Sequence, residues 1–111
     1  MSDTNAENEN PVLDLLARMT ADSLETSSLD AETLILVRVA ALVAIGAPPV
    51  SYLLNLEAAG EMGIDPEELR GVLAAVAPIV GTARVAAATG NIVKALAVEI
   101  EVAELDSQDD V

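Results

Sequence analysis

At 111 residues the chain has the length of one small domain, and its 52% of hydrophobic residues exclude an intrinsically disordered protein. The formal net charge of −14 comes from 19 acidic and five basic residues, and a surface of this sign disfavours binding to nucleic acid or to an anionic membrane. Cysteine and histidine are absent, which excludes disulfides, thiol chemistry and metal sites built on thiolate or imidazole. The N-terminal residues lack the basic and apolar regions of a signal peptide, so we expect a cytoplasmic protein. We also expect no metal or other cofactor.

The start of the chain predicts a tail, a helix and a connection. Residues 1–10 are polar and predict a disordered acidic tail. Apolar residues then recur at helical spacing over residues 11–21, which predicts a first helix, and the polar residues 22–29 predict a connection. We expect the folded domain to cover residues 11–105 and residues 106–111 to form an acidic C-terminal tail.

The second predicted helix has clear signals at both ends. Asp30 is placed to cap its first turn with a side-chain oxygen, and Gly46 suits the left-handed position that ends a helix. Apart from Arg38, this helix is apolar on every side after its first turn, so we expect it to be the central, buried helix. The charge-free run after Arg38 is long enough to suggest a membrane span. Because Gly46 and two prolines interrupt that run, two buried helices joined by a turn are the better interpretation, and we expect no membrane partner.

Proline and glycine also mark the third predicted helix. Pro49 suits the first turn of a helix, where its missing N–H group has no partner to lose. The helix should run to Met62, because Gly63 suits the left-handed position just past a helix end.

The stretch IDPEEL predicts the start of a fourth helix, with Asp65 as the N-cap and Glu68 closing a capping box. Pro78 would clash with the carbonyl group four residues before it, so this helix should end or kink there. A last helix is expected over about residues 83–104. Because no stretch alternates as a strand does, the predicted fold class is all-α, a compact domain of five to six helices.

The predicted helices have more apolar surface than one short protomer can cover. The excess lies on the second and third helices and on the alanine-rich face of the last one. We therefore expect a homo-oligomer held by apolar helix packing, with the acidic tails pointing outward.

Three motifs follow one another in a fixed order: Leu29-Asp30, the stretch GIDPEEL that begins at Gly63, and Gly81-Thr82-Ala83-Arg84. Their order and spacing over residues 29–98 resemble the carboxymuconolactone decarboxylase family, which includes the alkylhydroperoxidase D-like proteins. The resemblance implies a compact helical protomer that assembles as a homotrimer or homohexamer.

The resemblance also implies a role for the third helix. In the peroxidase branch this helix begins with C-x-x-C-x-x-x-H, in which one thiolate attacks peroxide and the second cysteine resolves the product. Counted back from the end of the helix, those positions hold Pro48, Ser51 and Asn55 here, and a family glutamate position falls near Ile35 or Leu36. The chain therefore lacks thiol peroxidase chemistry. The decarboxylase branch relies on a histidine and a carboxylate, and the side chain of Asn55 cannot exchange a proton near neutral pH.

The polar groups left on the third helix are the first candidates for a binding site. Ser51 and Asn55 are four residues apart and hence lie on one helix face, with Tyr52 beside them. These groups could orient a small polar ligand, or they could simply bond to backbone groups nearby.

Three charged residues are further candidates, each with a structural alternative. Arg38 could bind a substrate carboxylate, or it could pair with Glu57 or Glu61 or reach a subunit interface. Arg84 opposes the dipole of the last helix, so an anionic ligand or an interface ion pair should favour it there. Glu57 follows the Asn55 position and is the only nearby carboxylate able to act as an acid or base, unless it faces water.

The leading hypothesis is a non-redox, homo-oligomeric helical protein that has a structural role or binds a small carboxylated or apolar molecule. The rival hypothesis is a cofactor-free lyase or isomerase acting on a small carboxylated or lactone substrate. In that enzyme Arg38 or Arg84 would hold the carboxylate and Glu57 would transfer the proton. Tyr52 or Asn55 would then stabilise an enolate. A third possibility is that the acidic residues 99–111 bind another protein.

Overall fold

A computed structural model describes the backbone of residues 10–109 and the side chains of residues 10–98. This part of the chain forms five α-helices joined by short connections. In chain order they are α2 (Pro11–Thr26), α3 (Ala31–Ile45), α4 (Pro49–Glu61), α5 (Pro66–Val80) and α6 (Thr82–Asp109). The predicted all-α fold class is therefore confirmed. None of these helices is long and apolar enough to cross a membrane.

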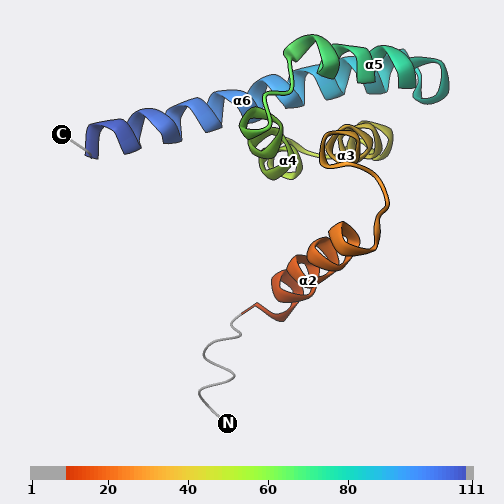
Figure 1. Ribbon diagram of the computed structural model, residues 1–111. Coiled ribbons are helices and arrows are strands. Elements are labelled where there is room, and N and C mark those ends of the chain that lie inside the picture. Colours follow the sequence, from red (N-terminus) through yellow and green to blue (C-terminus); the bar gives the residue numbers. More distant parts are fainter. Residues whose placement is uncertain (1–9, 110–111) are drawn as a thin grey trace.

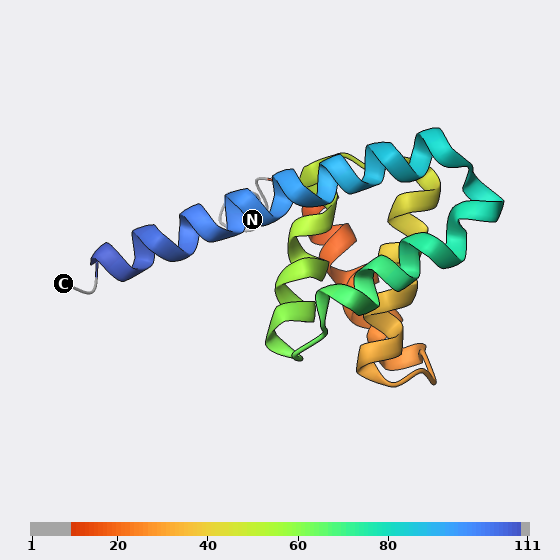
Figure 2. The same cartoon turned by 90° about the horizontal axis from the view of Figure 1, so that it is seen from above.

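Helices α3 to α6 pack together as one body. Helix α3 contacts α4, α5 and α6, and α4 also packs along α6. Figure 1 shows α5 and α6 on one side of the α3–α4 pair, with the C-terminal part of α6 continuing well past the body. Figure 2 shows the same body from above, where α5 and α6 diverge from the turn that joins them.

The core of this body comes from one side of each of α3, α4 and α6, with the turn residues Ala47 and Ile64. Among the described side chains the buried apolar residues are Leu34, Ile35, Val39, Val43, Ala47, Tyr52, Leu56, Ala59, Ile64, Ala88, Ile92 and Ala95. Helix α3 is central, as predicted, but it is not buried on all sides. Val37 and Ile45 are 51% and 71% exposed on its outer face.

The helix ends follow from local sequence at most positions. Asp30 Oδ1 accepts a hydrogen bond from Thr33 N over 2.8 Å, which confirms the predicted N-cap. The hydrogen bond from this backbone N–H lowers the pKa of Asp30, because it favours the ionised carboxylate. Gly46 and Gly63 have φ values of 70° and 74°, so both occupy the left-handed positions expected of them.

Three predicted boundaries differ from the structure. Helix α2 continues to Thr26, although it was expected to end at Ala21, because neither glycine nor proline interrupts this stretch and Leu24 continues the helix face of Leu16 and Thr20. Helix α5 does not end at Pro78 but continues to Val80, because Ala74 is exposed and water can solvate the carbonyl group that the proline leaves unpaired; the alternative prediction of a kink stays a prediction. Helix α6 runs to Asp109 instead of Glu104, because neither glycine nor proline interrupts that stretch.

The predicted capping box on α5 is not the contact found. Asp65 is the N-cap, but its Oδ1 accepts from Glu67 N over 2.9 Å. The Glu68 carboxyl instead lies beside Glu32 of α3. A hydrogen bond between these two side chains raises the pKa of Glu68, and the negative charge of Glu32 adds to the shift.

Helix α2 lies apart from the body and buries none of its residues. Figure 1 shows it beneath α3 and α4, joined to the body by an extended linker. The radius of gyration of 16.3 Å exceeds the roughly 13 Å of a compact chain of about this length, because α2 and the end of α6 both protrude. The expected N-terminal tail, apart from the N-cap Asn10, lies outside the described residues, as do residues 110–111 of the expected C-terminal tail.

Candidate functional site

A groove of about 720 Å³ lies between α2 and the α3–α4 pair. This volume falls within the roughly 300–1,000 Å³ of typical small-molecule sites, so a small organic ligand fits. Most of the lining is apolar, and four polar side chains face into it. The lining residues are Leu16, Thr20, Leu24, Ile35, Arg38, Ala41, Leu42, Val50, Ser51, Leu54, Asn55, Ala58 and Met62.

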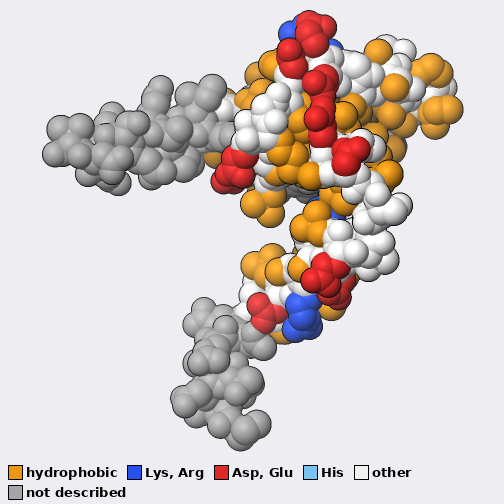
Figure 3. All heavy atoms as spheres, in the orientation of Figure 1, with side chains coloured by type: hydrophobic (Ala, Val, Ile, Leu, Met, Phe, Trp, Pro, Cys, Tyr) orange, Lys and Arg blue, Asp and Glu red, His pale blue; other side chains and the backbone are white. Residues whose placement is uncertain are grey.

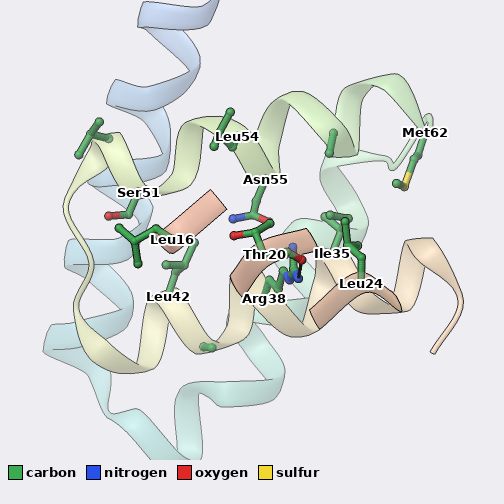
Figure 4. A pocket seen from close by; sticks show the side chains of 13 residues that line it. Leu16, Thr20, Leu24, Ile35, Arg38, Leu42, Ser51, Leu54, Asn55 and Met62 are labelled. Atoms are coloured by element: carbon green, nitrogen blue, oxygen red, sulfur yellow. Dashed lines mark hydrogen bonds between the residues drawn. The ribbon is translucent and has the colours of Figure 1, made fainter. Parts of the chain in front are cut away.

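Three of the four polar side chains lie in the middle of the groove, and Ser51 lies toward one end, near Leu16 (Figure 4). Figure 4 shows Asn55 of α4 pointing toward the part of the groove where Arg38 of α3 lies. In the same view Leu16 and Leu42 lie toward one end, and Leu24 and Met62 lie toward the other. A ligand in the groove would therefore meet polar groups at its centre and hydrocarbon on both sides.

Arg38 connects α3 to α2. Its Nη2 donates to Ser23 Oγ over 3.0 Å and to the carbonyl oxygen of Thr20 over 3.4 Å. Both acceptors are uncharged. Among the described side chains the one ion pair joins Arg70 to Glu67 on the surface of α5, so neither Glu57 nor Glu61 pairs with Arg38.

Ser51 and Asn55 lie one helical turn apart on the groove side of α4, as their spacing predicted. Both are half-buried. Within residues 10–98 neither side chain has a hydrogen-bond partner, whereas Thr89 on α6 does donate back to the carbonyl oxygen of Val85. The donors and acceptors of Ser51 and Asn55 are therefore available to a ligand or to water.

The other three candidate residues lie outside the groove. Tyr52 is fully buried in the core, and its hydroxyl has no hydrogen-bond partner among the described residues. Burial raises the pKa of Tyr52, because it disfavours the phenolate. Glu57 is exposed and does not line the groove. The Nη1 atom of Arg84 donates to the carbonyl oxygen of Ala44, near the C-terminus of α3.

The sequence reasoning did not include α2 in the site. Leu16, Thr20 and Leu24 recur every four residues and form one side of the groove. The sequence did contain a signal for this role of α2. The helix has an apolar stripe, and the helices that follow it in the chain are apolar on several sides, so α2 could be expected to pack against them.

The chemical capacity of the groove is limited. None of its lining residues is a carboxylate, a histidine or a cysteine, so the groove contains no acid or base that titrates near neutral pH. Over the part of the chain with described side chains, no group of three or more acidic residues is placed to hold a metal ion. The groove can donate and accept hydrogen bonds, offer one positive charge and bury hydrocarbon.

The fold and this groove define an all-α protein with a small-molecule-sized site, whose described lining includes serine and threonine hydroxyls but no base to activate them. A protein-family model for the carboxymuconolactone decarboxylase family matches residues 10–91, and the chain belongs to this family. The resemblance inferred from the motif order is thereby confirmed. No curated protein and no solved structure matches the chain.

The family match extends the resemblance toward the N-terminus. It begins at residue 10 instead of residue 29, so it includes α2 and with it all three sides of the groove. Ser51 and Asn55, which occupy the positions of the second cysteine and the histidine in the resemblance, both line the groove. Pro48, at the position of the first cysteine, is instead the N-cap residue of α4.

Proposed function

We propose that this protein is a non-redox member of the family that binds a small, largely apolar molecule in the groove between α2, α3 and α4. The observation that carries the proposal is the position of Ser51 and Asn55. They stand in a groove of suitable volume, at the places where the resemblance puts reactive groups, and neither side chain makes a hydrogen bond within residues 10–98. Without a cysteine, the chain lacks the group that thiol peroxidase chemistry requires.

The position of Glu57 favours binding over catalysis. Two residues beyond Asn55 correspond to about 200° around a helix, so the two side chains point to nearly opposite sides of α4. A lyase that uses Glu57 as its acid or base would need this carboxylate in the groove, and the groove lining does not include it.

We also propose that the protein acts as a homotrimer or homohexamer. Large apolar side chains outside the groove support an assembly, such as Ile79 on α5 and Val93 on α6, which are 86% and 60% exposed. Figure 3 shows hydrophobic side chains open on the surface of the helical body and of α2.

Calorimetric titration with 1-decanol and, separately, with decanoate tests the binding proposal. Ala41→Trp places an indole in the groove, and Ala74→Trp adds the same group to an exposed position on α5 that does not line it. We expect saturable binding of at least one probe, weakened about tenfold or more by Ala41→Trp and unchanged by Ala74→Trp. Binding of neither probe, or equal binding by both variants, would show that the groove is not a ligand site.

A further inference from the structure

We infer that the ligand of the groove is an apolar chain carrying a single carboxylate, and that Arg38 is the group that binds its charge. This inference rests on the proposed binding function and adds the chemical class of the ligand. It follows from the hydrogen bonds of Arg38, from its burial and from the charges around it.

Several N–H donors of the Arg38 guanidinium are unpaired among the described residues. Its Nη2 atom makes both contacts to α2, and Nε and Nη1 donate to no acceptor within residues 10–98. A guanidinium carries five N–H donors in a planar fork that matches a carboxylate. A ligand carboxylate can therefore bind without displacing the contacts of Arg38 to Thr20 and Ser23.

The charge of Arg38 has no described counter-charge. All five basic residues lie within the part of the chain whose side chains are described, and Arg38 is the one that is half-buried. Arg70 pairs with Glu67, and Arg84 faces the carbonyl end of α3, whereas Arg38 contacts only neutral oxygens. A partly desolvated cation among apolar side chains favours an anion more than a solvated surface cation does.

The same charge count limits the ligand to one negative group. Among the described residues that line the groove, Arg38 is the only charged one, so a second carboxylate on the ligand would find no cation there. The formal net charge of −14 also disfavours a dianion, although salt screens charges more than about 8 Å away under physiological conditions.

The rest of the ligand must be hydrocarbon. The apolar lining residues around Arg38 and Asn55 are four leucines, two alanines, one isoleucine, one valine and one methionine. Along α4 the lining runs from Val50 to Met62, a distance of about 18 Å at 1.5 Å per residue. An elongated chain therefore suits the groove better than a compact polar molecule, with the amide of Asn55 as a further donor to the carboxylate.

The test compares three probes of the same chain length, namely decanoate, 1-decanol and decanedioate, by calorimetry below their aggregation concentrations. We expect decanoate to bind about tenfold more tightly than 1-decanol, because hydrogen bonds to an ionised group are about twice as strong as neutral ones. Decanedioate should bind more weakly than decanoate.

Variants at Arg38 and at its neighbours assign the preference. Arg38→Met keeps most of the apolar stem and removes the charge, so it should bring decanoate and 1-decanol to equal affinity. Arg38→Lys should keep part of the preference, because the charge remains and the planar fork is lost. Arg70→Met, which removes a cation outside the groove, should keep both affinities and the full preference. Ser23→Ala, which removes an acceptor that helps to hold α2, should weaken the binding of decanoate and 1-decanol alike.

Other results would contradict the ligand class, the binding function or the role of Arg38. Equal binding of decanoate and 1-decanol by the wild-type protein, with Ala41→Trp still blocking both, would refute the ligand class and leave the binding function intact. Absence of binding by all three probes would refute the binding function as well. If Arg38→Met is folded by circular dichroism and retains the preference, a different group binds the anion. If Arg38→Met does not fold, the preference of the wild-type protein for decanoate and the reduced preference of Arg38→Lys still test whether Arg38 binds the carboxylate.

Discussion

Arg84 Nη1 donates a hydrogen bond to the carbonyl oxygen of Ala44 over 2.7 Å, and this contact joins the first turn of α6 to the last turn of α3. The carbonyl groups at a helix C-terminus lack partners within the helix and carry partial negative charge, which a guanidinium stabilises. The sequence indicated that something other than the α6 dipole must favour Arg84 at its position. In this structure that partner is the end of α3.

The first prediction is that Arg84→Met lowers the free energy of unfolding by about 1 kcal/mol, the usual contribution of one such hydrogen bond together with a helix-terminus charge effect. Urea denaturation gives the value. Arg70→Met is the matched control, because its exposed pair with Glu67 contributes little, and a change below about 0.5 kcal/mol is expected. Equal effects of the two substitutions would show that the α3–α6 contact adds nothing to stability.

The second prediction concerns Tyr52, whose buried hydroxyl has no partner among the described residues. Tyr52→Phe removes this group and keeps the ring, so we expect the protein to gain roughly 1 kcal/mol, the lower end of the penalty for a buried unpaired polar group. Tyr52→Leu, which changes the shape of the core, should lose stability. A loss with Tyr52→Phe would instead reveal a partner for the hydroxyl, such as a buried water molecule.

The third prediction uses the raised pKa of Glu68, which results mainly from its hydrogen bond to Glu32. The folded state holds this proton more tightly than the unfolded chain does, where the pKa is near 4.5. The resulting stabilisation is complete below that value and is lost as the pH rises through the higher folded pKa. Wild-type protein should therefore lose stability relative to Glu68→Gln as the pH rises.

Denaturation of both proteins between about pH 4.5 and about pH 7 measures this difference, above the sequence isoelectric point of about 4.1 where solubility is lowest. Glu61→Gln serves as the control, because Glu61 is not part of the pair. A constant difference between wild type and Glu68→Gln over this range would contradict the shared hydrogen bond.

The fourth prediction concerns assembly. Apolar packing between protomers should give a trimer or hexamer that changes little with added salt, since buried apolar area contributes about 25 cal/mol per Å² and carries no charge. Light scattering at micromolar concentration measures the mass. A monodisperse species of 11.4 kDa would contradict the assembly, and dissociation on adding salt would show that ion pairs hold it together.

The sequence predicted the helix starts and turns well, because a few residues determine them locally. Asp30 caps α3, Asp65 caps α5, and Gly46 and Gly63 take the left-handed positions. The extent of α2 and α6 was less predictable. Their outer segments are mostly polar, with a single leucine each, and in such segments the main indication that a helix continues is the lack of a stop signal.

The candidate site was predictable in part. Ser51 and Asn55 share one face by their spacing, and the same geometry could have separated Glu57, which is only two residues from Asn55. Spacing does not separate Tyr52, which is three residues before Asn55 but is buried in the core. The role of α2 could not be derived in this way. Its position depends on long-range contacts, chiefly those of Arg38 with Thr20 and Ser23, which no local pattern specifies.

One side of the groove is thus formed by a helix that buries none of its residues. An isolated helix of 16 residues is only marginally stable in water, so the free energy of ordering α2 is included in any affinity that the groove shows. A neighbouring subunit that packs on the exposed Val12 and Met19 would order α2 before the ligand binds, so ligand binding would cost less free energy. Ligand affinity would then rise with protein concentration, and by thermodynamic reciprocity the ligand would strengthen the assembly by the same factor.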